Sequence, residues 1–156
     1  RIMDFIEKSN PKIVNYLEYT ASKVDVYGQE LYISTGTKIY ILSLKDPENP
    51  ELISVIGEYA KDIVFFENYI LVANDFEEKI SIYDISDIKM PKKLSEIINL
   101  KEIDSMGIVD EYLYIAQKNK GLGIYKIDER NRPKFITRKK GNFYNMKSIK
   151  NFKYIY

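Results

Sequence analysis

Four oxygen-bearing side chains, Asn74, Asp75, Glu77 and Glu78, form the densest group of candidate metal ligands in the 156-residue sequence. Carboxylate and amide oxygens are the ligands that hard cations such as Ca²⁺ prefer. Their spacing matches neither the EF-hand loop nor the calcium-binding nonapeptide repeat, and it occurs only once. We therefore expect a solvated surface loop here rather than a metal centre.

A basic cluster near the C-terminus is the second candidate for chemistry. Residues 118–156 carry a formal charge of +10, whereas residues 1–117 carry −9. Lysine and arginine beside aromatic rings form the combination that binds single-stranded nucleic acid. Strand alternation, however, places Phe135 on an inward face, so we expect an exposed outer strand and no nucleic-acid partner. The cluster comprises Arg130, Arg132, Lys134, Arg138, Lys139 and Lys140, with Phe135, Phe143 and Tyr144 nearby.

The sequence contains no Cys and no His. Without Cys there is no disulfide, no thiolate zinc site and no thiol nucleophile. Without His the commonest general base and the commonest transition-metal ligand are missing. A pair of carboxylates could still act as acid and base, but no two acids recur at matched positions. We assign no catalytic, cofactor-binding or metal-binding residue and expect no cofactor.

The elements that would position these side chains come from a repeat of about 40 residues. In each copy an apolar residue lies nine before a proline, and the four prolines are 39, 41 and 42 residues apart. No stretch sustains the apolar period of a helix, whereas each unit contains four short strand-like runs. We predict an all-β fold, a β-propeller of four-stranded antiparallel blades, with repeat frames 2–40, 41–81, 82–123 and 124–156.

Each predicted blade is built in the same order along the chain. Proline-led segments are expected to form exposed outer strands. An apolar strand, a short turn and a returning strand then form a hairpin, and a polar loop leads to a further strand. The expected strands are 11–19, 50–57, 91–98 and 133–137, then 24–27, 63–66, 106–109 and 146–149, then 31–34, 70–73, 113–116 and 153–156, and finally 38–42, 79–83 and 122–125.

Two sets of side chains recur with the repeat and have structural explanations. Aspartates near the start of the proline-terminated turns are expected to accept hydrogen bonds from backbone amides two residues on. Tyrosines in phase with the repeat are expected to fill blade-to-blade packing, with the hydroxyl at a rim. The aspartates are Asp4, Asp46, Asp84 and Asp87, and the tyrosines are Tyr32, Tyr40, Tyr83, Tyr114, Tyr125 and Tyr154.

The repeats resemble the LVIVD repeat family of prokaryotic β-propellers. The matching pieces are Leu113–Ala116 with Gly121–Ile127, Ile82–Asp87 and the turn Asp46–Pro50, and the resemblance covers nearly the whole chain. The usual glycine before the returning strand is kept only as Gly28, and the last unit is degenerate. The resemblance implies a repeat scaffold of largely unknown role, often in exported or cell-surface proteins, and it carries over no catalytic residue.

The sequence begins in the middle of one repeat and ends in the middle of another. Either residues 2–19 complete the sheet that residues 146–156 begin, which closes four blades, or the chain is part of a larger propeller whose remaining blades are its partners. The absence of an initiator Met favours a processed or partial chain, and the compartment stays open. No apolar run is long enough for a membrane-spanning helix.

For function we expect a non-catalytic repeat scaffold that presents loops to a protein or a surface glycan. The loops expected to share one face are 35–37, 58–61, 74–78, 101–104, 117–120 and 142–145. One alternative is a propeller enzyme of the glycosidase or lactonase type that depends on carboxylates or a cation. The other is a binder of anionic polymers that uses the basic C-terminal repeat.

Overall fold

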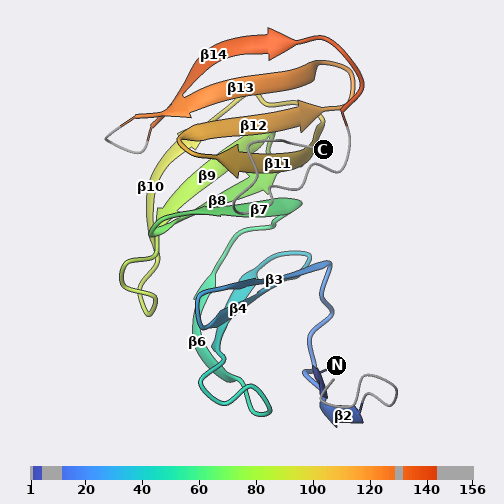
Figure 1. The fold of residues 1–156 in the computed structure, drawn as a ribbon, viewed down its shortest axis with the longest axis vertical. Helices are drawn as coiled ribbons and strands as arrows, with labels where there is room; N and C mark the ends of the chain where they lie inside the picture. Colours follow the sequence, from blue (N-terminus) through green and yellow to red (C-terminus); the bar gives the residue numbers. More distant parts are fainter. Residues whose placement is uncertain (1, 5–11, 129–131, 144–156) are drawn as a thin grey trace. The chain divides into compact units, whose positions relative to one another are not determined.

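The computed structural model describes residues 2–4, 12–128 and 132–143, which form fourteen β-strands and no helix (Figure 1). No part of this described chain therefore forms a helix that is long and apolar enough to cross a membrane. The strands are β1 (Ile2–Asp4), β2 (Lys12–Asn15), β3 (Lys23–Tyr27), β4 (Glu30–Ser34), β5 (Ile39–Ser43), β6 (Glu51–Ile56), β7 (Asp62–Phe66), β8 (Tyr69–Asn74), β9 (Lys79–Asp84), β10 (Lys92–Ile97), β11 (Ile103–Val109), β12 (Tyr112–Gln117), β13 (Gly121–Ile127) and β14 (Pro133–Lys139).

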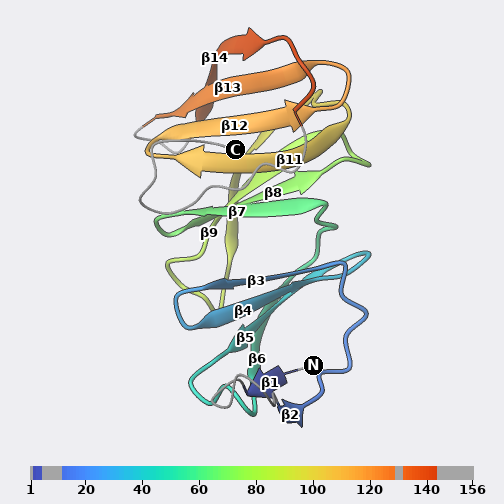
Figure 2. The ribbon, with the colours of Figure 1, turned by 45° about the vertical axis from the view of Figure 1, so that its right-hand side comes forward.

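The strands make three four-stranded antiparallel sheets and one two-stranded sheet, and consecutive strands are neighbours in each (Figure 2). We call β3–β6 the first blade, β7–β10 the second blade, β11–β14 the third blade, and the pair β1–β2 the partial blade. Antiparallel meanders of four strands that recur along the chain are the blades of a β-propeller. The predicted fold class is therefore confirmed.

The chain divides into two compact units. Residues 1–59 hold the partial blade and the first blade, and residues 60–156 hold the second and third blades. The predicted repeat frames that begin at residues 41, 82 and 124 start inside the third strands β5, β9 and β13, so each frame joins parts of two consecutive sheets. The strands expected at 146–149 and 153–156 lie outside the described residues.

Each blade begins with the same hairpin turn, and its first residue has a left-handed backbone. In the first blade this residue is Gly28, with φ of 63°. In the second and third blades it is Glu67, with φ of 50°, and Asp110, with φ of 53°. The second and third blades thus have acids in the place of Gly28, and these acids adopt the backbone conformation that favours glycine.

A β-bulge marks the pairing of the third and fourth strands in every blade. The register shifts at Ile41/Leu42 in the first blade and at Ile124/Tyr125 in the third. The second blade shifts at Lys93/Ser95, and the partial blade shifts at Ile2/Met3. An inserted residue increases the local twist of the strand pair. The shared bulge identifies β1 and β2 as the third and fourth strands of their blade.

The core of the second unit lies between its two blades. Apolar side chains from β8 and β9 pack against side chains from β11, β12 and β13. Ala73 and Ala116, near the ends of the returning strands β8 and β12, are fully buried. The buried set is Leu71, Ala73, Ile80, Ile82, Leu100, Ile103, Met106, Leu113, Ile115, Tyr125 and Ile127.

The proline-led strands are the outer strands, as predicted. β6, β10 and β14 each form the last strand of their sheet, and most of their side chains are exposed or half-buried. Phe135 on β14 corrects one expectation, because its side chain is 55% exposed. It pairs with Tyr125 and shares the face of that buried ring, with the ring centroids 5.4 Å apart. Its exposure follows from its place on the outermost strand.

Candidate functional site

The acidic stretch between β8 and β9 forms a self-contained loop. Asn74 is buried, and its Oδ1 accepts a hydrogen bond from the Glu77 amide at 3.0 Å. The Glu77 carboxylate pairs with Lys79, and Glu78 lies 4.0 Å from the Lys101 ammonium. Across the described ranges no three His, Cys, Asp or Glu side chains are grouped so that they could hold a metal ion. Glu77 and Glu78 therefore act here as partners of lysines.

Three connections meet at one end of the second unit, and we call this end the loop face: 75–78, 98–102 and 118–120. The strand registers place all three at the same end of their sheets. The Leu100 amide donates to the Glu78 carbonyl at 2.7 Å, and the Lys118 amide donates to the Glu102 carbonyl at 3.1 Å. Each connection is thus bonded to the next, so the loop face has a defined backbone shape.

Side-chain hydrogen bonds also connect the segments of the loop face. Gln117 is buried, and its Nε2 donates to the Lys101 carbonyl at 2.6 Å. Its Oε1 accepts a hydrogen bond from Arg138 Nη1, also at 2.6 Å. Asn119 Nδ2 donates to both carboxylate oxygens of Glu102, at 2.8 and 2.9 Å. Sequence patterns did not single out Gln117, because its role depends on a partner 21 residues away.

Two large apolar side chains project from this loop face. Phe76 is 78% exposed in the β8–β9 loop, and Ile98 is 63% exposed directly after β10. Both belong to the second blade, where Ile97 pairs with Ile80 at the same end of the sheet. Exposed aromatic and aliphatic groups on a rigid loop frame are the features of a protein-contact surface.

A buried carboxylate, also missed by sequence patterns, links the two blades of the second unit. Asp62 Oδ2 accepts a hydrogen bond from the Met106 amide at 2.6 Å, and its Oδ1 accepts one from the Ile63 amide at 3.0 Å. The side chain is 7% exposed. A carboxylate that bonds a neighbouring blade's backbone serves packing.

At the opposite end of the blades, the turn aspartates have the role that the sequence predicted. The amide of Ser86 donates to Asp84 Oδ1 at 2.8 Å, and that of Glu48 donates to Asp46 Oδ1 at 3.1 Å. Asp87 accepts from the Lys89 amide at 3.0 Å. Hydrogen bonds from Ser86 lower the pKa of Asp84, and those from Asn49 and Glu48 lower the pKa of Asp46. Asp4 lies in β1, and no side-chain role is described for it.

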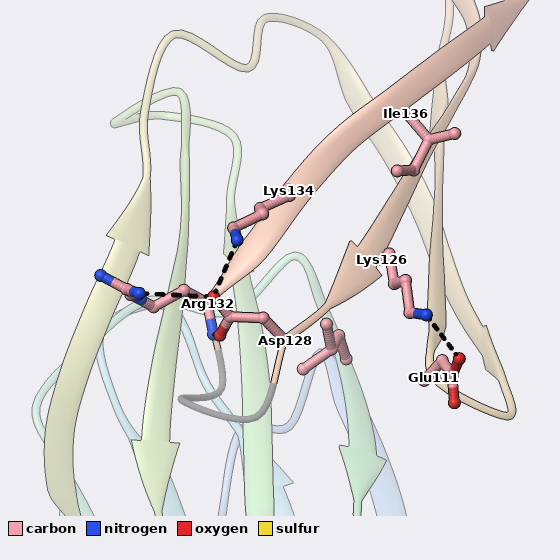
Figure 3. A pocket seen from close by; sticks show the side chains of 7 residues that line it. Glu111, Lys126, Asp128, Arg132, Lys134 and Ile136 are labelled. Atoms are coloured by element: carbon pink, nitrogen blue, oxygen red, sulfur yellow. Dashed lines mark hydrogen bonds and ion pairs between the residues drawn. The ribbon is translucent and has the colours of Figure 1, made fainter.

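A pocket of about 760 Å³ also lies at the turn end of the third blade (Figure 3). Lys126 Nζ lies 3.0 Å from Glu111 Oε1, and this pairing raises the pKa of Lys126. Arg132 and Lys134 both approach Asp128 Oδ2, at 3.4 and 3.5 Å. Each cation of the pocket therefore already faces a carboxylate. The lining is Glu111, Lys126, Ile127, Asp128, Arg132, Lys134 and Ile136.

The basic cluster of the sequence is divided by this arrangement. Arg132 and Lys134 lie at the turn end of β14 beside Asp128. Arg138 lies towards the loop face, where it bonds Gln117 and the Lys120 carbonyl. Lys139 and Lys140 are exposed. Arg130 and Tyr144 lie outside the described residues. Among the described members of the cluster, two share one carboxylate at the turn end and one is bonded at the loop-face end.

The recurrent tyrosines occupy buried and half-buried positions. Tyr125 belongs to the core between the second and third blades, and its burial raises the pKa of its hydroxyl. Tyr114 packs on the other face of the third blade. The rings of Tyr40 and Tyr19 contact each other in the first unit at a tilt of 47°, with centroids 4.7 Å apart. These contacts agree with a packing role, and Tyr154 lies outside the described residues.

Comparison with known proteins supports the fold. The structure is similar to a putative 6-phosphogluconolactonase from Bacteroides fragilis NCTC 9343, with 16% identity and a TM-score of 0.60 over 85% of this chain. It is also similar to the computationally designed Ika8 protein, with 10% identity and a TM-score of 0.59 over 82% of the chain. The N-terminal domain of Nup159 matches 77% of the chain with 14% identity and a TM-score of 0.52.

The sequence comparisons give no further assignment. No protein-family model matches the chain, and no curated protein matches it. The chain spans 46% of the lactonase-like protein, 40% of Ika8 and 30% of the Nup159 domain. What these neighbours share with it is the β-propeller fold.

Proposed function

We propose that this protein is a non-catalytic repeat scaffold, of the LVIVD-repeat type, whose loop face contacts a protein partner. The observation that carries the proposal is Phe76, which is 78% exposed on a loop that backbone and side-chain hydrogen bonds hold in place. An apolar anchor on a pre-formed frame loses little conformational freedom on binding. A surface glycan that stacks on the same ring is the second ligand class for this surface.

Charged and polar groups surround the apolar anchors and suit a polar rim. Lys101 and Glu78 lie beside the β8–β9 loop, and Asn119 and Glu102 extend the surface to the third blade. A central apolar contact with a polar surround is the usual anatomy of a protein interface. Glu77, Glu78 and Glu102 of the loop face are paired with lysine or asparagine, and this arrangement favours contact over acid–base chemistry.

The proposal is tested with a photo-crosslinking amino acid at position 76, and the crosslinked partner is identified by mass spectrometry. Binding of the protein to a glycan array tests the second ligand class. Met90 is the matched control, because it is 75% exposed in the same blade but lies in the turn at the other end of the sheet. We expect capture at position 76 and not at 90. Phe76→Ala should weaken binding about 30-fold or more, the effect of a typical hot spot. Binding that Met90→Ala abolishes and Phe76→Ala leaves intact contradicts the proposal.

A further inference from the structure

Four exposed lysines gather at the loop-face end of the third blade. Lys118 and Lys120 lie in the β12–β13 connection, and Lys139 and Lys140 lie at the end of β14 and directly after it. The two pairs are neighbours in space, because Gly121 closely approaches the backbone of Lys139 and Lys140. We call these four side chains the lysine cluster.

The lysine cluster differs from the cations at the turn end of the same blade. There Lys126 faces Glu111, and Arg132 and Lys134 share Asp128. Among residues 2–4, 12–128 and 132–143, no carboxylate forms an ion pair with any member of the lysine cluster. The described acids therefore leave the positive charge of the cluster available to a partner.

Backbone hydrogen bonds connect the lysine cluster to the apolar anchors of the loop face. The Leu100 amide bonds the loop that carries Phe76, and the Glu102 carbonyl accepts from the Lys118 amide. Ile98 begins the same connection that contains both Leu100 and Glu102. The loop face is therefore one continuous surface, with exposed apolar side chains on the second blade and unpaired positive charge on the third.

The backbone of this surface is fixed before any partner binds. Glu78, Asn99 and Glu102 have a left-handed backbone, with φ of 53°, 63° and 56°. Such conformations persist where the surrounding structure holds them, and they are frequent at sites that clamp a ligand. A pre-formed surface loses little conformational freedom on binding.

Acids on the same face decide which kind of anion fits the lysine cluster. Glu77 and Glu78 lie in the loop that carries Phe76, and their carboxylates are near Lys79 and Lys101. A nucleic acid carries a phosphate at every nucleotide, so a strand laid along the loop face would bring negative charge against these acids. A peptide can place carboxylates on the lysine cluster alone and an apolar side chain on Phe76. The charge pattern therefore favours a peptide.

We propose that the protein partner of the loop face presents an acidic segment, an inference that rests on the proposed function. An apolar residue of this segment contacts Phe76 and Ile98, and its carboxylates lie on the lysine cluster. Exposed ion pairs add little affinity each, but complementary charge fixes orientation and speeds the encounter. The segment therefore binds in one direction, with its apolar residue on the second blade and its acids on the third.

Selection from a phage-displayed library of random dodecapeptides on the immobilised wild-type protein tests the chemistry of the partner. We expect the recovered peptides to contain a run of Asp or Glu on one side of an aromatic or aliphatic residue. A selection that recovers no binder, or peptides with no more acids than the starting library, overturns the proposal.

One recovered peptide is then titrated against matched variants. Alanine in place of both lysines of the β12–β13 connection, or of both lysines at the end of β14, should weaken binding about fivefold at low salt. The difference should shrink as salt screens the charges. Lys89→Ala with Lys92→Ala is the control, because both are exposed lysines at the turn end of the second blade. Circular dichroism checks the fold of each variant, and equal effects of cluster and control variants overturn the proposal.

The same titrations separate this proposal from the proposed function. If Phe76→Ala weakens binding and the lysine variants do not, the loop face remains a protein-contact surface and the acidic partner is ruled out. If Phe76→Ala leaves binding intact, the proposed function fails, and the acidic segment on this face fails with it. Single-stranded oligothymidylate that binds more tightly than the peptide, and loses affinity in the lysine variants, assigns the cluster to a nucleic acid and also overturns the proposal.

Discussion

At the scale of single residues, the hairpin turns show how this sequence departs from its own repeat. Gly28 takes a left-handed backbone, and Glu67 and Asp110 take nearly the same φ in the equivalent turns of the second and third blades. An L-residue pays about 1–2 kcal/mol for that conformation. The cost recurs at the same place, so it is a property of the turn geometry that every blade hairpin shares.

Glu67→Gly should raise the free energy of unfolding by about 1 kcal/mol, because relief of the left-handed strain exceeds the extra freedom of glycine in the unfolded chain. Chemical denaturation measures the change. Asn68→Gly is the control, since Asn68 is the next residue of the turn and lacks a positive φ. We expect Asn68→Gly to lower the free energy of unfolding by about 0.5–1 kcal/mol. Equal effects of the two substitutions are incompatible with the strain argument.

The turn aspartates make stability depend on acid pH. Hydrogen bonds from the Ser86 hydroxyl and amide lower the pKa of Asp84 below its ordinary value of 3.8. A lowered pKa means that the ionised form stabilises the fold above the unfolded pKa, and that this contribution is lost as the pH falls through the folded value. Asp84→Asn accepts the same amide bond without titrating. We expect its thermal midpoint to fall less than that of wild type between pH 5 and strongly acid pH.

At the scale of elements, the start of β13 depends on one glycine. Gly121 has φ of 82°, and a Cβ there would lie 2.2 Å from the Lys139 carbonyl oxygen of the paired strand β14. A backbone atom cannot move aside as a flexible side chain can. The outer strand thus approaches the sheet closely at the loop face, where Arg138 also bonds Gln117.

Gly121→Ala should lower the free energy of unfolding by about 3 kcal/mol or more. The added Cβ would occupy a residue with a left-handed backbone and would overlap a main-chain oxygen. Gly36→Ala is the matched control, because an added Cβ there meets nothing within 4 Å and its φ is not positive. We expect the control to be neutral or to gain about 0.4–1 kcal/mol from a less flexible unfolded chain. Thermal unfolding of both variants compares their stabilities. A Gly121→Ala variant as stable as the wild type would show that β14 can move away from β13.

Asp62 links two blades through a single carboxylate. Asp62→Ala leaves the buried Met106 amide without this acceptor, so we expect a loss of about 1–3 kcal/mol in the free energy of unfolding. Glu51→Ala, on the exposed start of β6, removes the same charge and should change stability by less than about 0.5 kcal/mol. Denaturant titration that finds the two variants equal would mean that water replaces the lost carboxylate oxygen.

At the scale of the whole molecule, charge is distributed unevenly along the chain, with −9 before residue 118 and +10 from there on. The structure reduces what this asymmetry can do, because Arg132 and Lys134 share Asp128 and Arg138 bonds Gln117. Lys139 and Lys140 are exposed on and after the outer strand. Of the described cations at the basic end of the sequence, Arg132, Lys134 and Arg138 therefore already have polar partners within the third blade.

Retention on heparin tests this conclusion for the whole protein. Lys139→Ala with Lys140→Ala should lower the salt concentration needed for elution more than Arg132→Ala with Lys134→Ala, because the second pair already faces a carboxylate. Both changes remove two charges, so each is the control for the other. A larger effect of the Arg132 and Lys134 pair would assign polyanion binding to the pocket at the turn end of the third blade.

Much of the fold followed from patterns that are local in the sequence. The prolines at 50, 91 and 133 predicted the outer strands, and Asp46, Asp84 and Asp87 predicted the turns, because turn chemistry depends on neighbours within a few residues. The candidate site was less accessible. Gln117, Asp62 and Arg138 matter through partners 16 to 44 residues away. Strand alternation predicted an inward position for Phe135, yet its side chain is exposed because it lies on the outermost strand β14.

The sequence by itself determined that this protein is a repeat of four-stranded antiparallel blades, and it determined which strand of each blade lies outermost. The repeat length, the proline positions and the alternation of apolar and polar residues are features of short sequence segments, and they recur along the chain. The tertiary structure decided what the acidic stretch 74–78 does, which cations are paired, and that Phe76 projects from a hydrogen-bonded loop face. Several of those outcomes depend on contacts between different strands and connections, such as Lys126 with Glu111 and Leu100 with Glu78, and such contacts are formed only when the strands are paired and packed.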